Sequence, residues 1–169
     1  MDLFESSDYV ITGKHSDMLR KLVSVWEIFP SYVTVIPIAA LLGLMMNRTA
    51  KKDIKEGNSK IQFAQLDRYG EIILRSFQLV ILNEPSERKA EDRINNVFRR
   101  ETALPEDKEL FNSYVRGGIE YLVEVISADS EGDENDEAHR MLNITKMIDD
   151  IDFENGGCTV EAVLKSIKN

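Results

Sequence analysis

The sequence is short of the residues that most often carry out chemistry. Its 169 residues include one cysteine, Cys158, and two histidines, His15 and His139. A single cysteine excludes a disulfide within the chain and a cysteine-rich zinc site. The histidines lie in unrelated segments, and nothing in the sequence brings either one to Cys158 as a catalytic pair. No Gly-x-Ser-x-Gly, Walker or dinucleotide-binding fingerprint occurs, so we expect no catalytic residues, no metal site, no cofactor and no enzyme activity.

Positive charge is also scarce. The chain has 21 Lys and Arg against 30 Asp and Glu, a formal net charge of -9. This balance argues against a dedicated duplex-DNA-binding protein, which needs a clustered cationic surface to displace counterions. No secretory leader opens the sequence, because Asp2 and Glu5 are acidic and no apolar segment follows them. We therefore expect a cytoplasmic protein.

One uncharged run, residues 28–46, has to be weighed as a membrane span. Pro30 and Pro37 interrupt it, and the uninterrupted part, residues 38–46, is too short to cross the hydrocarbon of a bilayer. We therefore predict a buried helix over residues 36–46, with Pro37 in its first turn, and no contact with a membrane.

The remaining sequence is a series of helical stripes separated by proline, glycine and capping residues. The expected helices cover residues 18–29, 36–46, 66–82, 86–101, 105–126, 138–151 and 160–167. We expect their inward faces to include Ile72, Ile73, Phe77, Ile94, Val97, Phe98, Met141, Leu142 and Ile148. A turn signal at residues 56–59 allows one short β-hairpin near residues 50–63. The fold class is therefore all-α: a single compact domain over residues 1–169, with six to seven helices.

Two stretches interrupt this series. Residues 1–14 have no clear period, and we expect an N-terminal arm that packs through its apolar side chains. Residues 128–137 contain acidic residues and no basic ones, which is typical of a flexible solvated loop; a cation or a basic partner is the alternative. The spacing of these acids does not match an EF-hand. We expect residues 138–169 to form a C-terminal helical extension.

The organising element is the helix over residues 111–126. Its large apolar residues recur at helical spacing, yet Gly117 and Gly118 lie in the middle, at a cost of roughly 1 kcal/mol each relative to alanine. The glycines let a helix of the same chain, or the backbone of a partner, approach closely. Tyr114 and Tyr121 share their face, so Tyr114, Gly117, Gly118 and Tyr121 are candidate partner-binding residues, with core packing as the alternative. If this face pairs with itself, the protein is a homodimer.

The most cationic window is residues 47–60. A basic patch that includes residues from elsewhere in the chain would contact an acidic partner or a phosphate backbone; a solvated loop is the alternative. The candidate patch residues are Arg48, Lys51, Lys52, Lys55, Arg99 and Arg100.

Two short motifs have the residue types of a metal-dependent nuclease site: Asp53-Ile-Lys55 and Glu106-Asp-Lys108. Such a site needs its acids on a pair of strands that hold the metal. The first motif lies in an expected loop and the second opens an expected helix, so we rank this interpretation last.

Three segments together resemble a known family. They are Ile36-Pro-Ile-Ala-Ala-Leu-Leu-Gly-Leu with the following Asn47-Arg-Thr, then Tyr69-Gly-Glu-Ile-Ile-Leu, and Phe111-x-x-Tyr-Val-x-Gly-Gly-Ile-Glu-Tyr-Leu. In this order they resemble the small proteins associated with the bacterial Dnd (DNA phosphorothioation) systems and related antiphage-defence clusters. The resemblance covers about residues 25–127, and the sequence beyond Ser127 departs from it.

The resemblance implies a function without a catalytic site, because the family supplies no established catalytic residues to transfer. It implies a non-catalytic accessory or adaptor subunit of an antiphage-defence complex. Its partner would be a larger DNA-acting ATPase or nuclease subunit, with nucleic acid contacted through the complex. The alternative from the residues alone is a protein that contacts nucleic acid directly through its basic patch.

Overall fold

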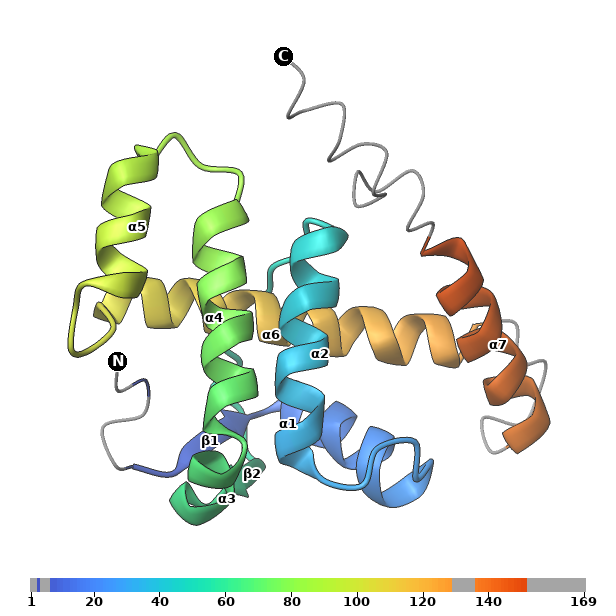
Figure 1. Cartoon of the computed structure of the whole chain (residues 1–169). Helices are drawn as coiled ribbons and strands as arrows, with labels where there is room; N and C mark the ends of the chain where they lie inside the picture. The colour runs from blue at the N-terminus through green and yellow to red at the C-terminus, as the bar shows by residue number, and fades with distance from the viewer. Residues whose placement is uncertain (1–2, 4–6, 129–135, 152–169) are drawn as a thin grey trace. The chain divides into compact units, whose positions relative to one another are not determined.

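The computed structural model describes residues 3, 7–128 and 136–151. In chain order the elements are β1 (Tyr9–Thr12), α1 (Lys14–Arg20), the π-helix η1 (Lys21–Val25), α2 (Tyr32–Met45), β2 (Asn58–Ile61), α3 (Phe63–Arg68), α4 (Gly70–Asn83), α5 (Ala90–Phe98), α6 (Pro105–Ile126) and α7 (Glu137–Asp150) (Figure 1). The all-α fold with one short pair of strands is therefore confirmed.

The chain divides into two compact units, Met1–Val123 and Glu124–Asn169, and the boundary falls within α6. The expectation of a single domain over residues 1–169 stays a prediction. The acidic loop, Phe4, Cys158 and the helix expected at residues 160–167 lie wholly or largely outside the described residues.

The strand expected near residues 50–63 is β2, but its partner comes from the N-terminal arm. β1 and β2 pair antiparallel, with Tyr9 opposite Ile61. Ile11 of β1 and Ile61 of β2 are buried, whereas Val10 is exposed, as the alternating faces of a strand require. The arm thus packs through part of its apolar residues, and backbone pairing fixes its register.

The core of the first unit lies where α2 and α4 cross α6. Figure 1 shows α2 and α4 side by side, both crossing α6. The apolar stripe of α6 is buried along its length, as predicted; it consists of Phe111, Val115, Ile119, Leu122 and Ile126. The ring of Phe77 in α4 meets that of Phe111 edge to face, with centroids 5.7 Å apart, a geometry that aromatic pairs favour.

Helix α2 starts earlier than predicted. It begins at Tyr32, so Pro37 lies inside the helix and not in its first turn, at a position where it donates no hydrogen bond to the preceding turn. In the described part of the chain, no helix combines the length and the apolar character needed to cross a membrane.

Several predicted inward faces are corrected. In α4, Ile73 and Phe77 are buried as expected, but Ile72 is exposed. The seam of α5 is reduced to one buried residue, Val97, while Ile94 and Phe98 are exposed. Periodicity identifies an apolar side of a helix, but it does not say whether another element covers that side.

Helix α7 shows the same difference within the second unit. Met141, Leu142 and Ile148 are exposed, while Arg140 and Asn143 are buried. The Asn143 amide donates to the carbonyl oxygens of Ile126 (3.2 Å) and Ala128 (2.8 Å). These two bonds satisfy carbonyls at the end of α6 and turn the polar side of α7 inward.

Candidate functional site

At Gly117 and Gly118, helix α6 lies in close contact with α2 and the segment that follows it. A Cβ added to Gly118 would lie 1.8 Å from the carbonyl oxygen of Ala39 in α2, and one added to Gly117 would lie 2.1 Å from that of Arg48. Gly43 of α2 approaches the Tyr114 carbonyl in the same way, at 2.2 Å. No side chain fits at these positions. The contacts account for the glycines through packing inside the fold, the first of the two interpretations of the sequence.

The proposed docking surface on this face is corrected. Tyr114, Gly117 and Gly118 are buried, so they contact α2 and the segment after it and offer no surface to a partner. Tyr121 is half-buried, and the Arg48 guanidinium lies 5.6 Å from its ring centroid, within the range of a cation–π contact. A homodimer that pairs through these glycines is incompatible with this packing.

The same crossing anchors the start of the cationic segment Arg48–Gly57, which we call the basic loop. The Arg48 amide donates to the Gly43 carbonyl at the end of α2 (2.8 Å). The Ala50 amide donates to the Ser113 carbonyl (2.9 Å), and Arg116 Nε donates to the Ala50 carbonyl (2.8 Å). The loop backbone is therefore bonded directly to α6.

Asp53 anchors the middle of the basic loop. Its carboxylate accepts hydrogen bonds from the amides of Lys14 (2.9 Å) and Lys55 (3.1 Å), and these bonds lower the pKa of Asp53 below its usual 3.8. Its backbone carbonyl accepts a bond from the Thr12 hydroxyl. The Gly13 amide donates to the Gly57 carbonyl (2.9 Å) and closes the far end. The loop is held at its start, middle and end.

Held in this way, the basic loop presents one apolar side chain among lysines. Ile54 is 89% exposed, and Lys51, Lys52 and Lys55 are exposed beside it in sequence. The side chains of Lys51 and Lys52 have no hydrogen bond or ion pair with any described residue. An isoleucine this exposed gains nothing from the fold of its own chain.

The six cations of the predicted patch come from different parts of the fold, and their gathering into one surface stays a prediction. Arg99 and Arg100 follow α5, which packs on α4, and Arg100 donates to Asn96 near the end of α5 (3.1 Å). Arg48 lies over Tyr121. Lys51, Lys52 and Lys55 of the basic loop are exposed, as are Arg99 and Arg100.

One acid of each nuclease-like motif has structural partners. Asp53 binds backbone amides, as described above, and Asp107 pairs with Arg88 and Asn96. Among residues 3, 7–128 and 136–151, no three His, Cys, Asp or Glu side chains lie close enough together to hold a metal ion.

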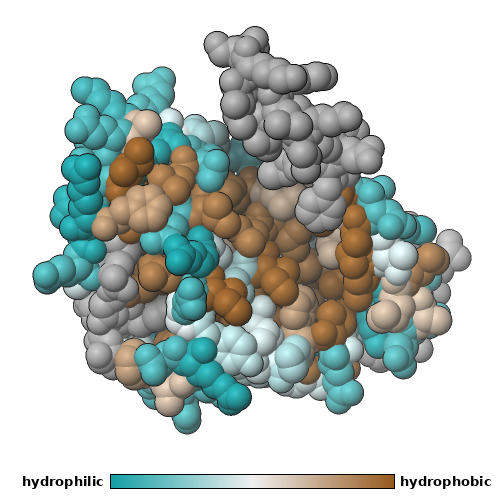
Figure 2. Space-filling model, viewed as in Figure 1, coloured by the Kyte–Doolittle hydropathy of each residue, from teal (hydrophilic) through white to brown (hydrophobic). Residues whose placement is uncertain are grey.

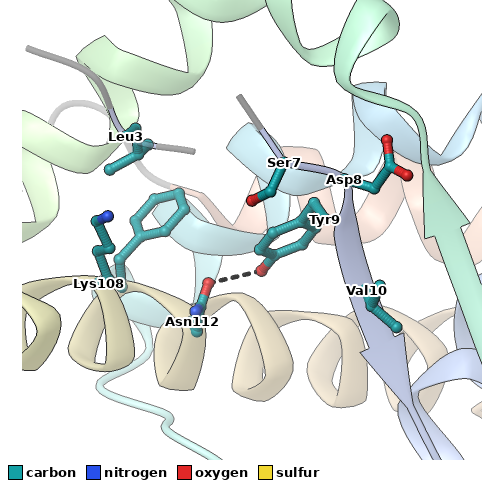
Figure 3. Close-up of a pocket in the computed structure, with 8 residues that line it drawn as sticks. Leu3, Ser7, Asp8, Tyr9, Val10, Lys108 and Asn112 are labelled. Atoms are coloured by element: carbon teal, nitrogen blue, oxygen red, sulfur yellow. Dashed lines mark hydrogen bonds between the residues drawn. The ribbon is translucent and has the colours of Figure 1, made fainter. Parts of the chain in front are cut away.

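A cavity of about 220 Å³ lies between the N-terminal arm and α6 (Figure 3). Leu3, Tyr9, Phe111 and Asn112 are among its lining residues. The Tyr9 hydroxyl donates to Asn112 Oδ1 (2.7 Å), and burial raises the pKa of Tyr9. The hydrogen bond connects β1 to α6, and the raised pKa keeps the Tyr9 phenol protonated at neutral pH. The cavity thus holds a structural contact and no activated nucleophile.

Sequence reasoning missed two features of the site. Ile54 was expected within the short hairpin near residues 50–63, and the anchoring of the loop by Asp53 was not expected. The available signal was an acid placed between lysines in a turn-forming segment, since Asp readily bonds nearby backbone amides.

The sequence was compared with protein-family models, with curated proteins and with solved structures, and none of the three comparisons finds a match.

Proposed function

We propose that the protein is a non-catalytic accessory subunit that binds a larger protein through its basic loop. The supporting observation is the anchored loop, in which exposed Ile54 is flanked in sequence by three exposed lysines. Because hydrogen bonds already hold the loop backbone, binding costs less conformational entropy than it would for a mobile segment.

The chemistry of the loop selects a partner with an acidic rim and an apolar pocket. Lysines at the rim of an interface speed encounter with an opposite charge and reject wrong partners. A single apolar side chain buried at the centre of such a contact supplies much of the binding energy. An acidic surface around an isoleucine-sized pocket satisfies both requirements.

The family resemblance suggests the identity of this partner: a DNA-acting ATPase or nuclease subunit of a bacterial antiphage-defence complex in the cytoplasm. In that setting nucleic acid is contacted through the complex. The net charge of -9 favours contact with another protein over independent duplex binding.

Affinity capture from the native host tests the proposal. The bait is the full chain, compared with Ile54→Ala and with Val25→Ala, a matched variant at an exposed apolar residue in η1. We expect an ATPase or nuclease subunit to be captured by the wild type and by Val25→Ala, and affinity for it to fall about tenfold or more in Ile54→Ala. Capture of no such subunit, or equal capture by all three baits, contradicts the proposal.

Direct binding of nucleic acid is the second candidate, favoured by Lys51 and Lys52 of the basic loop, which are exposed and pair with none of the described residues. The test is a titration with DNA and RNA at two salt concentrations. Phosphate contacts predict affinity that falls steeply as salt rises, and a shallower salt dependence when Lys51 and Lys52 are replaced by alanine. No measurable affinity at low salt removes this candidate.

A further inference from the structure

Strand β1 is paired along one edge only. The Gly13 amide donates to the Gly57 carbonyl (2.9 Å) where the β1–β2 ladder ends. In an antiparallel ladder such hydrogen-bonded pairs alternate with pairs whose amides and carbonyls point outward. Val10 and Thr12, at odd distances from Gly13, therefore turn their backbone groups away from β2, and these groups bond to no other described residue. We call them the free edge of β1.

A cavity of about 70 Å³ runs along the free edge. All four residues of β1 line it, whereas a cavity on one face of a strand would meet only every second residue. Its other lining residues are Glu109, Asn112 and Arg116 of α6 and Lys52 of the basic loop. The hydrogen bond from Tyr9 to Asn112 (2.7 Å; Figure 3) holds the strand on α6, so the edge is fixed before anything binds to it.

The lining of this cavity is cationic, although the chain as a whole carries a net charge of -9. Arg116 is only 7% exposed; its Nε donates to the Ala50 carbonyl and its Nη2 to Glu109, while Nη1 bonds to no described residue. Lys52 is exposed and pairs with no described residue. Two cations and one carboxylate thus leave one positive charge without a counter-charge in the lining, and this charge attracts an anionic group.

The cavity has room for a side chain and not for a small-molecule ligand. Pockets for drug-sized ligands measure about 300–1,000 Å³, whereas this one measures about 70 Å³. A side-chain carboxylate supplies the missing charge, and the polypeptide that carries it supplies the backbone groups to which the free edge can bond. The exposed apolar surface over α2, α4 and α5 (Figure 2) has no such directional groups and selects no particular occupant.

We infer that an extended, acidic segment of a partner protein adds to β1 as a third strand. Its backbone bonds to Val10 and Thr12, as in strand addition to other sheet edges, and one of its carboxylates enters the cavity beside Lys52 and Arg116. Since Lys52 belongs to the basic loop, this inference deepens the proposed function: the same larger subunit contacts Ile54 and supplies the segment. The choice of that subunit as the source rests on the proposed function, whereas the chemistry of the segment rests on the free edge and the cavity.

Selection from a library of random peptides displayed on phage tests the strand site without the native partner. The full chain is immobilised, and we expect the enriched peptides to combine β-forming residues with Asp or Glu. Their affinity should fall about tenfold or more in Val10→Pro and in Lys52→Ala. Val10→Pro removes an outward amide without breaking the β1–β2 ladder.

Asn58→Pro is the matched control. Asn58 lies opposite Thr12, so the same substitution removes an outward amide from the far edge of β2, and peptide affinity should stay that of the wild type. Circular dichroism and a urea unfolding curve verify that each variant is folded. Amide exchange followed by NMR gives a second readout: the Val10 and Thr12 amides should exchange rapidly in the unbound chain and slowly with peptide bound. The Ile11 amide, which faces β2, should be protected in both states.

The inference is overturned if no peptide is enriched, if the enriched peptides lack acidic residues, or if Val10→Pro binds them as the wild type does. Unchanged exchange at Val10 and Thr12 overturns it as well. Affinity capture separates it from the proposed function. A subunit that Ile54→Ala loses and Val10→Pro retains leaves the proposed function standing and removes the strand contact. Acidic peptides that require Val10 and Lys52, together with no captured ATPase or nuclease subunit, support the strand site and contradict the proposed function.

Discussion

The imidazole of His15, fully buried in α1, lies 2.8 Å from a carboxylate oxygen of Glu120 in α6. Lys14 Nζ approaches the same oxygen at 2.7 Å. The other ring nitrogen of His15, Nδ1, is buried and has no hydrogen-bond partner among the described residues. The contact joins α1 to α6 through a buried imidazole ring whose Nδ1 is out of reach of water.

This geometry makes stability depend on pH. Burial lowers the pKa of His15 below 6.5, although Glu120 acts in the opposite direction. Between the folded pKa and 6.5, the unfolded chain binds the proton and the folded chain does not. Stability from this group is therefore complete above pH 6.5 and is lost as pH falls, by at most about 1.4 kcal/mol per pH unit.

Urea unfolding at pH 7.5 and 5.5 measures the effect. We expect the wild type to be less stable at pH 5.5, His15→Gln to lose most of this difference, and His139→Gln to keep it. Burial pushes the pKa of Glu120 upward, but hydrogen bonds from Lys14 and His15 lower it below 4.5 overall, so its own contribution is lost only below that pH. Equal stability at both pH values in the wild type contradicts the assignment to His15.

The crossing of α2 and α6 predicts that Gly118→Ala is severe. The added methyl would lie 1.8 Å from a backbone oxygen that cannot rotate away, so the helices must separate, at a cost of about 3 kcal/mol or more. Gly70→Ala is the matched control, because no atom lies within 4 Å of the position of its Cβ. We expect that variant to be as stable as the wild type or slightly more stable. Similar unfolding midpoints for the two variants would contradict the crossing.

The sequence predicted most helices and the buried stripe of α6, because periodicity and caps are local properties. It also indicated that Gly117 and Gly118 need a close neighbour. The sequence could not show that these neighbours are Ala39 and Arg48, nor that β1 pairs with β2. Both contacts join segments that are distant in sequence.

The exposed faces show a second limit of sequence reasoning. Ile72, Ile94 and Met141 follow apolar periods and were expected to face inward, yet they lie at the surface. A stripe shows which side of a helix avoids water; it does not show which molecule covers that side. The basic loop likewise became recognisable as a site only after folding, when Asp53 and α6 fixed its backbone and left Ile54 outside.

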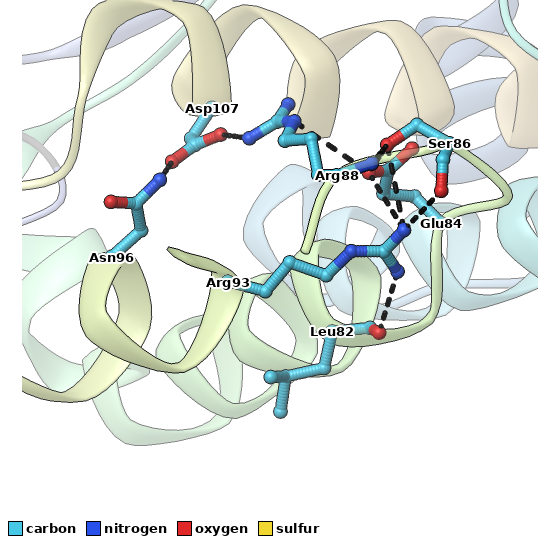
Figure 4. A network of polar contacts seen from close by, with 7 residues as sticks. All are labelled: Leu82, Glu84, Ser86, Arg88, Arg93, Asn96 and Asp107. Carbon is cyan, nitrogen blue, oxygen red and sulfur yellow. Dashed lines mark hydrogen bonds and ion pairs between the residues drawn. The ribbon is translucent and has the colours of Figure 1, made fainter. Parts of the chain in front are cut away.

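A polar network joins the ends of α4, α5 and α6 (Figure 4). Asp107, 1% exposed, accepts bonds from Arg88 and from Asn96 (3.1 Å). The hydrogen bond from Arg88 to Asp107 raises the pKa of that guanidinium. Glu84, also buried, lies 3.7 Å from Arg88 and 3.6 Å from Arg93. Each buried acid therefore has cationic partners, as burial of a charge requires.

Removing one member of this network should cost much more than removing an exposed ion pair. We expect Asp107→Ala to destabilise the fold by about 2–4 kcal/mol, because Arg88 loses its nearest anion and Asn96 its acceptor. Glu71→Ala, which breaks the exposed pair with Arg75, should cost about 0.5 kcal/mol or less. Urea unfolding curves of the two variants give the comparison. A loss under about 1 kcal/mol for Asp107→Ala would show that the network is not a stabilising contact.

The last prediction concerns Asn143, whose amide holds α7 to the end of α6. Replacing it with alanine removes both bonds and leaves the carbonyls of Ile126 and Ala128 without that donor, at a cost of about 1–2 kcal/mol. His139 Nε2, 3.2 Å from the Ala128 carbonyl, retains part of the contact. Because the remaining sides of α7 expose Met141, Leu142 and Ile148, little apolar packing replaces the lost bonds.

Amide hydrogen exchange resolves this local effect. In Asn143→Ala we expect faster exchange across α7, with protection in α2, α4 and the Phe111–Ile119 part of α6 unchanged, since local opening need not involve the core. Thr145→Ala is the control, because the bond that its hydroxyl makes among the described residues goes to the Met141 carbonyl within α7. Unchanged exchange in α7 of Asn143→Ala would mean that apolar contacts, and not this polar cap, hold the helix in place.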